Sequence, residues 1–323
     1  MKKITLATWL LLLSPAVLWA EGEENETSPD APAGAPSVIQ SDVPRVMPTP
    51  QETRIAGLVN RLSENHAHEI ETLTAEGEEF LGLFRESESG DPQGCVVILH
   101  GDHGHPDWPQ VVSPLREKLT QHSWCTLAIE IPDIRNRATP VQIQAEPTQD
   151  TQDDNTPELP NEATVFARID AAVALTQDKG YSQVVYLGYR TGAAYALRYT
   201  AEKGTTNQAL ILIEPRTSLP VSEYDLAQNI ERLRLPVLDY YFNRNTLVER
   251  FANYRQAAAN KRTNRSVNYT QIDALPDARY DPAGNKRLVQ RVWGFLKQNT
   301  NQQSQRKELP EFEKELFYKS PID

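Results

Sequence analysis

Residues 186–197 read YLGYRTGAAYAL, which combines the end of an apolar strand, a sharp turn between two glycines, and the start of an alanine-rich helix. Gly188 and Gly192 bracket Tyr189, Arg190 and Thr191 at the tip of this turn. A helix that begins directly after such a turn points its N-terminus, with its free backbone N–H groups, at whatever lies beyond the strand end. We therefore expect the functional edge of the fold at this turn.

The same order of strand and helix repeats on both sides of residues 186–197. A helix over 51–65 is followed by EIETLTAEGEEFLGLFRES, which predicts a β-hairpin with its turn at AEGE. This alternation predicts an α/β fold with a mostly parallel central sheet, an antiparallel N-terminal hairpin and helices on both faces. Further strands are predicted at CVVILHG, CTLAIEIP, QVVYLGY, ALILIEP, LPVLDYYF and SVNYTQIDAL, and further helices at 108–121, 162–179, 192–203, 222–232, 246–261 and 284–299.

An opening hairpin followed by parallel strands resembles the α/β-hydrolase fold, and the resemblance covers roughly residues 66–298. In that fold a G-x-S-x-G elbow presents a nucleophilic serine on a strained turn between strand and helix. Residues 188–192 take these five positions here, and Arg190 stands where the serine would be. A guanidinium stays protonated and cannot attack a carbonyl. Thr191 is not expected to replace it, because the residue after the nucleophile supplies a backbone N–H while its side chain points elsewhere.

The resemblance also implies a catalytic base and acid, which the sequence does not provide. All histidines precede the elbow, at positions 66, 68, 100, 103, 105 and 122, whereas the fold places its base after the last strand. That region reads DALPDARYDPAG, with Arg279 and Tyr280. The acid position offers Asn243 and Asn245, while Asp239 lies inside the predicted strand. We therefore predict no catalytic residues and no classical serine hydrolysis.

The stretch LHGDHGHPDWPQ, residues 99–110, carries two further signals. His100 and Gly101 resemble the oxyanion loop of the same fold, so both are candidates for ligand binding together with Arg190. The segment His105-Pro106-Asp107-Trp108 resembles a family of uncharacterised exported α/β-hydrolase-like proteins of Gram-negative bacteria, with an HPDW segment and an elbow that often lacks serine. This resemblance implies a fold and a location, without a substrate or partner.

Structural roles are expected for the HPDW residues. Asp107 is expected to cap a helix that begins near Trp108, with Pro109 in its first turn, and His105 to hydrogen-bond within the loop. A metal site is the alternative, since imidazole and carboxylate groups are normal zinc ligands. The spacing of these residues matches no established metal motif, so we predict no metal and no cofactor. The candidate ligands in this alternative are His100, Asp102, His103, His105 and Asp107.

Arg190 has two open interpretations. A guanidinium beside a helix N-terminus would form a site for a small carboxylate or phosphate, because arginine makes two parallel hydrogen bonds to such groups. Alternatively, Arg190 pairs with Glu130, Asp133 or Glu214 at neighbouring strand ends and fills the cleft.

The two cysteines, Cys95 and Cys125, each begin a predicted strand. If these strands are parallel neighbours in register, the cysteines lie within disulfide distance. The alternative is two buried free thiols. A disulfide would fit an exported protein, because exported compartments are oxidising.

The outer segments point to export. Residues 1–20 have the layout of a signal peptide, which implies a periplasmic protein, and no later segment is apolar enough to span a membrane. An uncleaved N-terminal anchor is the alternative, because Leu18 stands where a signal peptide usually has a small residue. Residues 21–50 read as a disordered linker, and the domain follows at 51–300 with a polar tail at 301–323. The acidic segment 136–161 is expected to be a flexible insertion, or alternatively a lid. Without residues 1–20, 31 basic and 44 acidic residues remain, a net charge of about −13 that argues against nucleic-acid binding.

Three functions remain open from the sequence. The protein is first expected to be an inactive, envelope-associated protein that binds an unknown partner through its surface. The second reading is a binder of a small anionic ligand at Arg190. The third is an unconventional hydrolase that uses the loop from His100 to Asp107.

Overall fold

The computed structural model describes residues 48–134, 157–204, 209–263, 267–274 and 282–302. The expected signal peptide and nearly all of the linker therefore lie outside the described residues. So do the acidic segment as far as residue 156, the tail beyond residue 302, and the positions of Arg279 and Tyr280. Of the acidic segment, residues 157–161 are described, and Leu159 among them is buried in the core.

The described residues form one eight-stranded sheet in the order β1-β2-β4-β3-β5-β6-β7-β8. The first two strands form the predicted hairpin, which turns at Glu76 and Gly77, both with positive φ. β2 pairs antiparallel with β4, and all the remaining pairs are parallel. The mostly parallel sheet is thus confirmed. The strands are β1 Ile70–Ala75, β2 Glu78–Arg85, β3 Gly94–Leu99, β4 Trp124–Ile129, β5 Val184–Tyr189, β6 Ala209–Ile213, β7 Val237–Phe242 and β8 Tyr269–Ala274.

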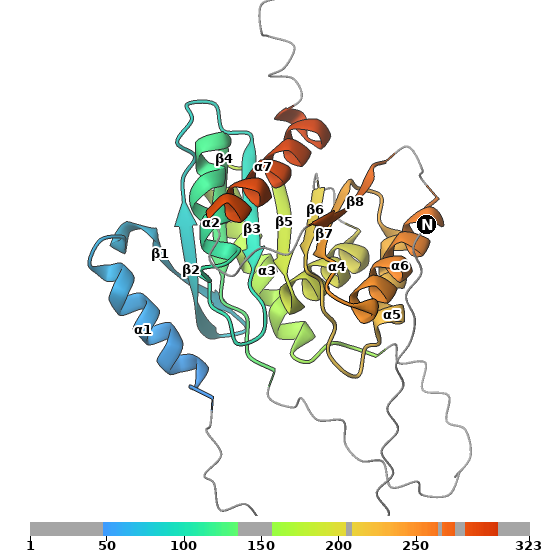
Figure 1. Ribbon diagram of the computed structural model, residues 1–323. Helices are drawn as coiled ribbons and strands as arrows, with labels where there is room; N and C mark the ends of the chain where they lie inside the picture. Colours follow the sequence, from blue (N-terminus) through green and yellow to red (C-terminus); the bar gives the residue numbers. More distant parts are fainter. Residues whose placement is uncertain (1–47, 135–156, 205–208, 264–266, 275–281, 303–323) are drawn as a thin grey trace, which may run out of the picture. The chain divides into compact units, whose positions relative to one another are not determined.

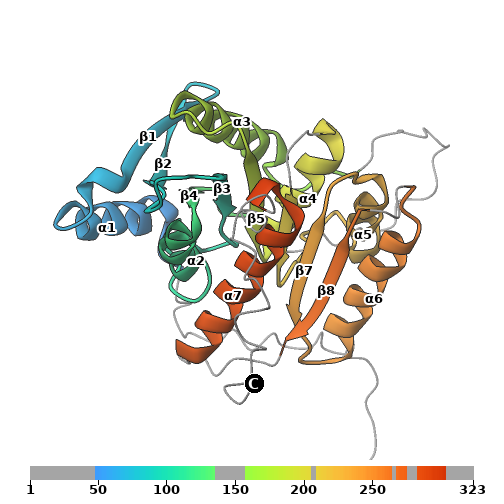
Figure 2. The ribbon, with the colours of Figure 1, turned by 90° about the horizontal axis from the view of Figure 1, so that it is seen from above.

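Helices cover both faces of the sheet (Figures 1 and 2). One face packs against α1, α2 and α7, and the other against α3 to α6. None of the helices in the described part of the chain is long and apolar enough to cross a membrane. The helices are α1 Gln51–Ser63, α2 Val112–Lys118, α3 Glu162–Asp178, α4 Thr191–Lys203, α5 Glu223–Arg232, α6 Thr246–Asn260 and α7 Pro282–Asn299.

The central strands are apolar along their whole length because both of their faces are covered. In β3, Cys95, Val97 and Leu99 point into the core under α3 to α6, while Val96 and Ile98 point into the core under α1, α2 and α7. All five side chains are fully buried. This packing fixes β3 and its neighbours, and with them the position of every loop at their carboxyl ends.

The disulfide alternative for the two cysteines is confirmed. Cys95 and Cys125 are direct partners in the parallel ladder between β3 and β4. Their Cα atoms are 4.4 Å apart and their sulfurs are bonded. The bond lies in the core beneath α3 to α6, where neither residue is exposed.

Candidate functional site

The elbow, residues 188–192, has the strained backbone of a nucleophile position. Arg190 has φ 54° and ψ −117°, between the end of β5 and the start of α4. Both glycines are required by close packing. A Cβ on Gly188 would lie 2.3 Å from the Cα of Ala193, and one on Gly192 would lie 2.3 Å from the carbonyl oxygen of His100. The sharp strand-to-helix turn predicted from the sequence is therefore present, with an arginine at its tip.

Strained residues gather at this edge of the sheet. His103, Arg190 and Glu214 all have positive φ, and they follow the neighbouring strands β3, β5 and β6. Such backbone conformations cost about 1 to 3 kcal/mol each for residues other than glycine, and they cluster at ligand and active sites. The carboxyl edge of the sheet is thus the candidate functional site.

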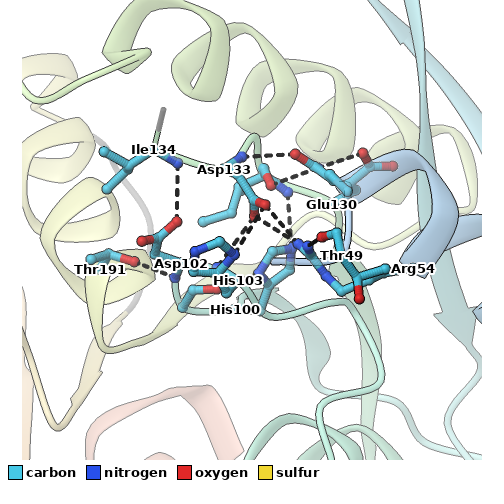
Figure 3. A network of polar contacts seen from close by, with 12 residues as sticks. Thr49, Arg54, His100, Asp102, His103, Glu130, Asp133, Ile134 and Thr191 are labelled. Carbon is cyan, nitrogen blue, oxygen red and sulfur yellow. Dashed lines mark hydrogen bonds and ion pairs between the residues drawn. The ribbon is translucent and has the colours of Figure 1, made fainter. Parts of the chain in front are cut away.

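The side chain of Thr191 is hydrogen-bonded to the loop that follows β3. The backbone N–H of Asp102 donates a hydrogen bond of 2.6 Å to the hydroxyl oxygen of Thr191 (Figure 3). In the hydrolase fold, an N–H of this loop would stabilise the oxygen of a reacting carbonyl. The sequence predicts that Thr191 does not act as the nucleophile, and its hydroxyl oxygen is used here as the acceptor for this loop N–H. A substrate oxygen would have to displace this hydroxyl.

His100 is a structural residue, contrary to the expectation that it contacts a ligand. Its side chain is buried and both ring nitrogens are engaged. Nδ1 lies 2.8 Å from the carbonyl oxygen of Gly101, and Nε2 accepts a hydrogen bond from the backbone N–H of Ile131. These partners define the neutral ring, and burial lowers the pKa of His100 to about 4. Gly101 is also buried, and a Cβ added to it would lie 3.1 Å from the Cβ of Arg190.

We expect His100 to make the protein acid-sensitive. Its pKa falls from an ordinary 6.5 to about 4 in the fold, so between these values the unfolded chain takes up a proton that the folded chain does not. The contribution of His100 to the free energy of unfolding is fully present above about pH 6.5. It is lost as pH falls towards 4, which lowers the free energy of unfolding by up to roughly 3 kcal/mol. Urea unfolding at pH 7 and pH 4 measures this loss. In His100→Gln, which keeps a donor and an acceptor, the loss should shrink; an equal loss in both proteins would contradict the assignment.

Asp102, His103 and Asp133 offer possible metal ligands within 4.8 Å of one another. However, Arg54 donates hydrogen bonds of 2.8 Å to both carboxylate oxygens of Asp133 (Figure 3). The backbone N–H of His103 donates to the same carboxylate. A guanidinium in this position already balances the charge that a cation would neutralise. Of the larger set considered from the sequence, the fold brings only Asp102 and His103 into this group.

The HPDW segment connects helices rather than capping one. Asp107 accepts hydrogen bonds from Arg61 of α1 and Arg116 of α2, at 3.1 and 2.9 Å. The predicted cap at Asp107 is wrong, because α2 begins only at Val112 and residues 109–111 form turns. His105 accepts a hydrogen bond from the backbone N–H of Asp107 and packs edge-on against Trp108. Pro106 is buried beside them.

Arg190 pairs with Glu214, one of the three partners considered from the sequence. Its Nε lies 3.7 Å from a Glu214 oxygen, too far for a hydrogen bond, and this buried Nε has no hydrogen-bond partner. The guanidinium also lies 5.1 Å from the Tyr189 ring, and burial raises the pKa of Tyr189 to about 12. One third of the Arg190 side chain remains exposed. The ion pair and an accessible guanidinium therefore coexist.

A model of a protein family of unknown function, DUF3530, matches residues 1–298. The chain belongs to the DUF3530 family. No curated protein matches the DUF3530 chain significantly.

Comparison with solved structures identifies the fold of the DUF3530 chain. A dienelactone hydrolase from Anabaena variabilis superposes with a TM-score of 0.52 and 16% identity, over 72% of this chain and 100% of the other. An esterase from Pyrococcus furiosus gives 0.50 and 15%, over 71% and 90%. Est1E from Butyrivibrio proteoclasticus gives 0.50 and 12%, over 71% and 98%. The predicted α/β-hydrolase-like fold is thereby confirmed.

Within this DUF3530 fold, the strand that precedes the acid position carries a buried ion pair. Asp239 of β7 accepts hydrogen bonds from Arg255 of α6 at 2.8 and 3.1 Å, and neither side chain is exposed beyond 1%. Tyr269 and Gln271 of β8 donate to the same carboxylate. The hydrogen bonds to Asp239 therefore hold α6 and β8 against β7. Asn243 and Asn245 stay on the surface, where Asn245 caps α6.

Proposed function

We propose that this protein is a catalytically inactive, periplasmic member of the α/β-hydrolase fold that binds a small carboxylate or phosphate at its former active site. The observation that carries the proposal is Arg190, an accessible guanidinium held at the tip of an intact nucleophile elbow. An interaction role rests on the segments 21–50, 136–161 and 301–323. The anion site is formed by side chains whose positions are known, Arg190 above all, so we favour anion binding over the interaction role.

Three features support inactivity. The elbow has an arginine in place of a nucleophile, and the sequence has no histidine after position 122. The loop N–H of Asp102 is bonded to Thr191. Asp239, the carboxylate inside β7, accepts a hydrogen bond from Arg255. Each feature removes a separate part of serine hydrolysis, and loss of one triad member alone removes most of the rate.

We expect no esterase activity from the purified mature protein. Hydrolysis of p-nitrophenyl acetate and butyrate should proceed at the rate of the buffer, and Arg190→Ser should not raise it, because the base is still missing. A stopped assay with excess protein measures this rate. Turnover that is saturable in ester and is abolished by Thr191→Val would contradict inactivity.

Two charges favour an anion at the elbow. Among the described residues, Glu214 is the acidic partner of the Arg190 guanidinium, at 3.7 Å, so the outer N–H groups of Arg190 keep capacity for a second acceptor. The helix α4 begins at Thr191, and its first turn adds backbone N–H groups and a partial positive charge. A carboxylate or phosphate at this point would receive charge-assisted hydrogen bonds from both.

We expect anions to stabilise the protein through Arg190. At ten times its dissociation constant, a ligand adds about 1.4 kcal/mol, which raises the melting temperature of a domain of this size by about 3 to 6 °C. Thermal unfolding against phosphate, acetate, succinate and phenyl phosphate measures the shift. Arg190→Ala should lose it.

The matched control is Arg61→Ala, which removes the same charge from an exposed ion pair with Asp107. This variant should keep the anion response of the natural sequence. If both variants lose the response, the effect is one of general charge; if neither loses it, Arg190 does not bind the anion.

A further inference from the structure

A cavity of about 320 Å³ opens at the ends of β6 and β7. Its walls come from the residues after β6, from the start of α5, from the end of β7 and from α6. Ligand sites in proteins begin at about 300 Å³, so the cavity is large enough for a small molecule.

The cavity is joined to the elbow through Glu214 and Arg216, which both line it. The Glu214 carboxylate lies 3.7 Å from Arg190 on one side and 2.9 Å from Arg244 on the other. The backbone N–H of Arg216 donates a hydrogen bond to the carbonyl oxygen of Arg190. An anion at Arg190 would therefore lie at the entrance of this cavity.

The cavity is basic, although the chain as a whole has a net charge of −11. Glu223, one of its carboxylates, is neutralised by Arg250 outside the lining. The lining holds Arg216, Arg244 and Arg255 against Glu214 and Glu223. Arg255 is paired with Asp239 behind the lining, so Arg216 and Arg244 remain against Glu214. A locally positive cavity on an acidic protein selects for anions.

The remaining wall is apolar. Phe251 of α6 and Phe242 of β7 line the cavity and are buried. Leu247, at the start of α6, also lines it and is 58% exposed. At this exposure most of the Leu247 side chain is in contact with water. A hydrocarbon group bound in the cavity would bury this apolar surface, which stabilises the complex.

We propose that Arg190 and this cavity together bind an amphiphilic anion, a carboxylate or phosphate monoester that carries a short hydrocarbon chain. The head group accepts hydrogen bonds from Arg190 and Arg244, and the chain lies against Leu247 and Phe251. This inference rests on the proposed anion site and adds the class of the ligand.

Calorimetric titration of the mature protein tests the proposal with acetate, butanoate, hexanoate and octanoate. Each added methylene should tighten binding by about two- to fourfold until the cavity is full. Titration with butyl and hexyl phosphate shows whether the site prefers a phosphate or a carboxylate head group. The proposal allows either the alkyl phosphates or the alkanoates to bind more tightly. Hexanol, which has no charge, should bind at least tenfold more weakly than hexanoate.

Two exposed leucines supply matched variants. Leu247→Ser should reduce the gain for each methylene and leave acetate binding unchanged. Leu219→Ser, at a residue that is 51% exposed and does not line the cavity, should change neither. Arg190→Gln should weaken every anion, and its unfolding transition shows whether it is folded.

The outcomes separate the two proposals. If all alkanoates bind equally and Arg190→Gln weakens all of them, the anion site stands and the amphiphile inference is overturned. If hexanol binds as tightly as hexanoate, or no anion binds, both are overturned. A gain with chain length that Leu247→Ser leaves intact overturns the assignment of this cavity.

Discussion

Replacement of Asp239 by alanine is expected to lower the free energy of unfolding by about 3 to 5 kcal/mol. Removal of one partner from a buried ion pair leaves the other charge without compensation, which is what costs this much. Arg255 would be left 1% exposed, between the rings of Phe251 and Tyr241. Tyr269 would lose its acceptor as well. Urea denaturation followed by circular dichroism measures the change.

Asp239→Asn and a double variant separate charge from shape. Asparagine keeps acceptor capacity for Tyr269 but removes the charge, so it should destabilise the protein less than alanine does. In Asp239→Leu/Arg255→Met both charges are gone, and most of the stability should return, because apolar replacements of a buried pair are often tolerated. A loss below about 1 kcal/mol in Asp239→Ala would show that Arg255 finds water or another partner.

The sheet and the elbow were predictable because they depend on local pattern. Continuous apolar runs such as CVVILHG indicate strands covered on both faces, and helical spacing between them requires parallel crossovers. Gly188 and Gly192 flank the turn at two positions where no side chain fits. Each of these signals lies within a few residues, so the sequence alone carries it.

The side-chain contacts of the site were not predictable, because they join distant segments. His100 is paired with the backbone of Ile131, and Asp107 with Arg61 and Arg116. From short stretches of sequence, Asp107 is predicted to cap a helix and His100 to contact a ligand. Contacts with distant segments determine the role of each residue instead. Glu214 was one of three acids at strand ends, and only the order of the strands places it beside Arg190.

A strained elbow without a nucleophile suggests that its shape is still used. A left-handed backbone at Arg190 costs about 1 to 3 kcal/mol, and glycine at that position would relieve it. The sequence instead holds a long, charged side chain there, on an edge where His103 and Glu214 are strained in the same way. A site that only filled space would not need a guanidinium one third exposed. The strained, charged elbow therefore favours ligand binding over an inherited scaffold.

Loss of the disulfide between Cys95 and Cys125 is expected to cost roughly 3 to 4 kcal/mol. The cysteines are separated by 30 residues, and in the chain-entropy model a loop of this length restricts the unfolded chain by that amount. Unfolding curves of the natural sequence with and without reductant measure the effect. The Cys95→Ala/Cys125→Ala variant should match the reduced protein, apart from a small packing loss at two fully buried positions.

The same experiment bears on where the protein works. A domain that needs this bond for several kcal/mol of its stability folds securely only in an oxidising compartment, so a large effect supports the proposed periplasmic location. If the reduced protein is as stable as the oxidised one, the bond is dispensable, and the disulfide lends no support to export.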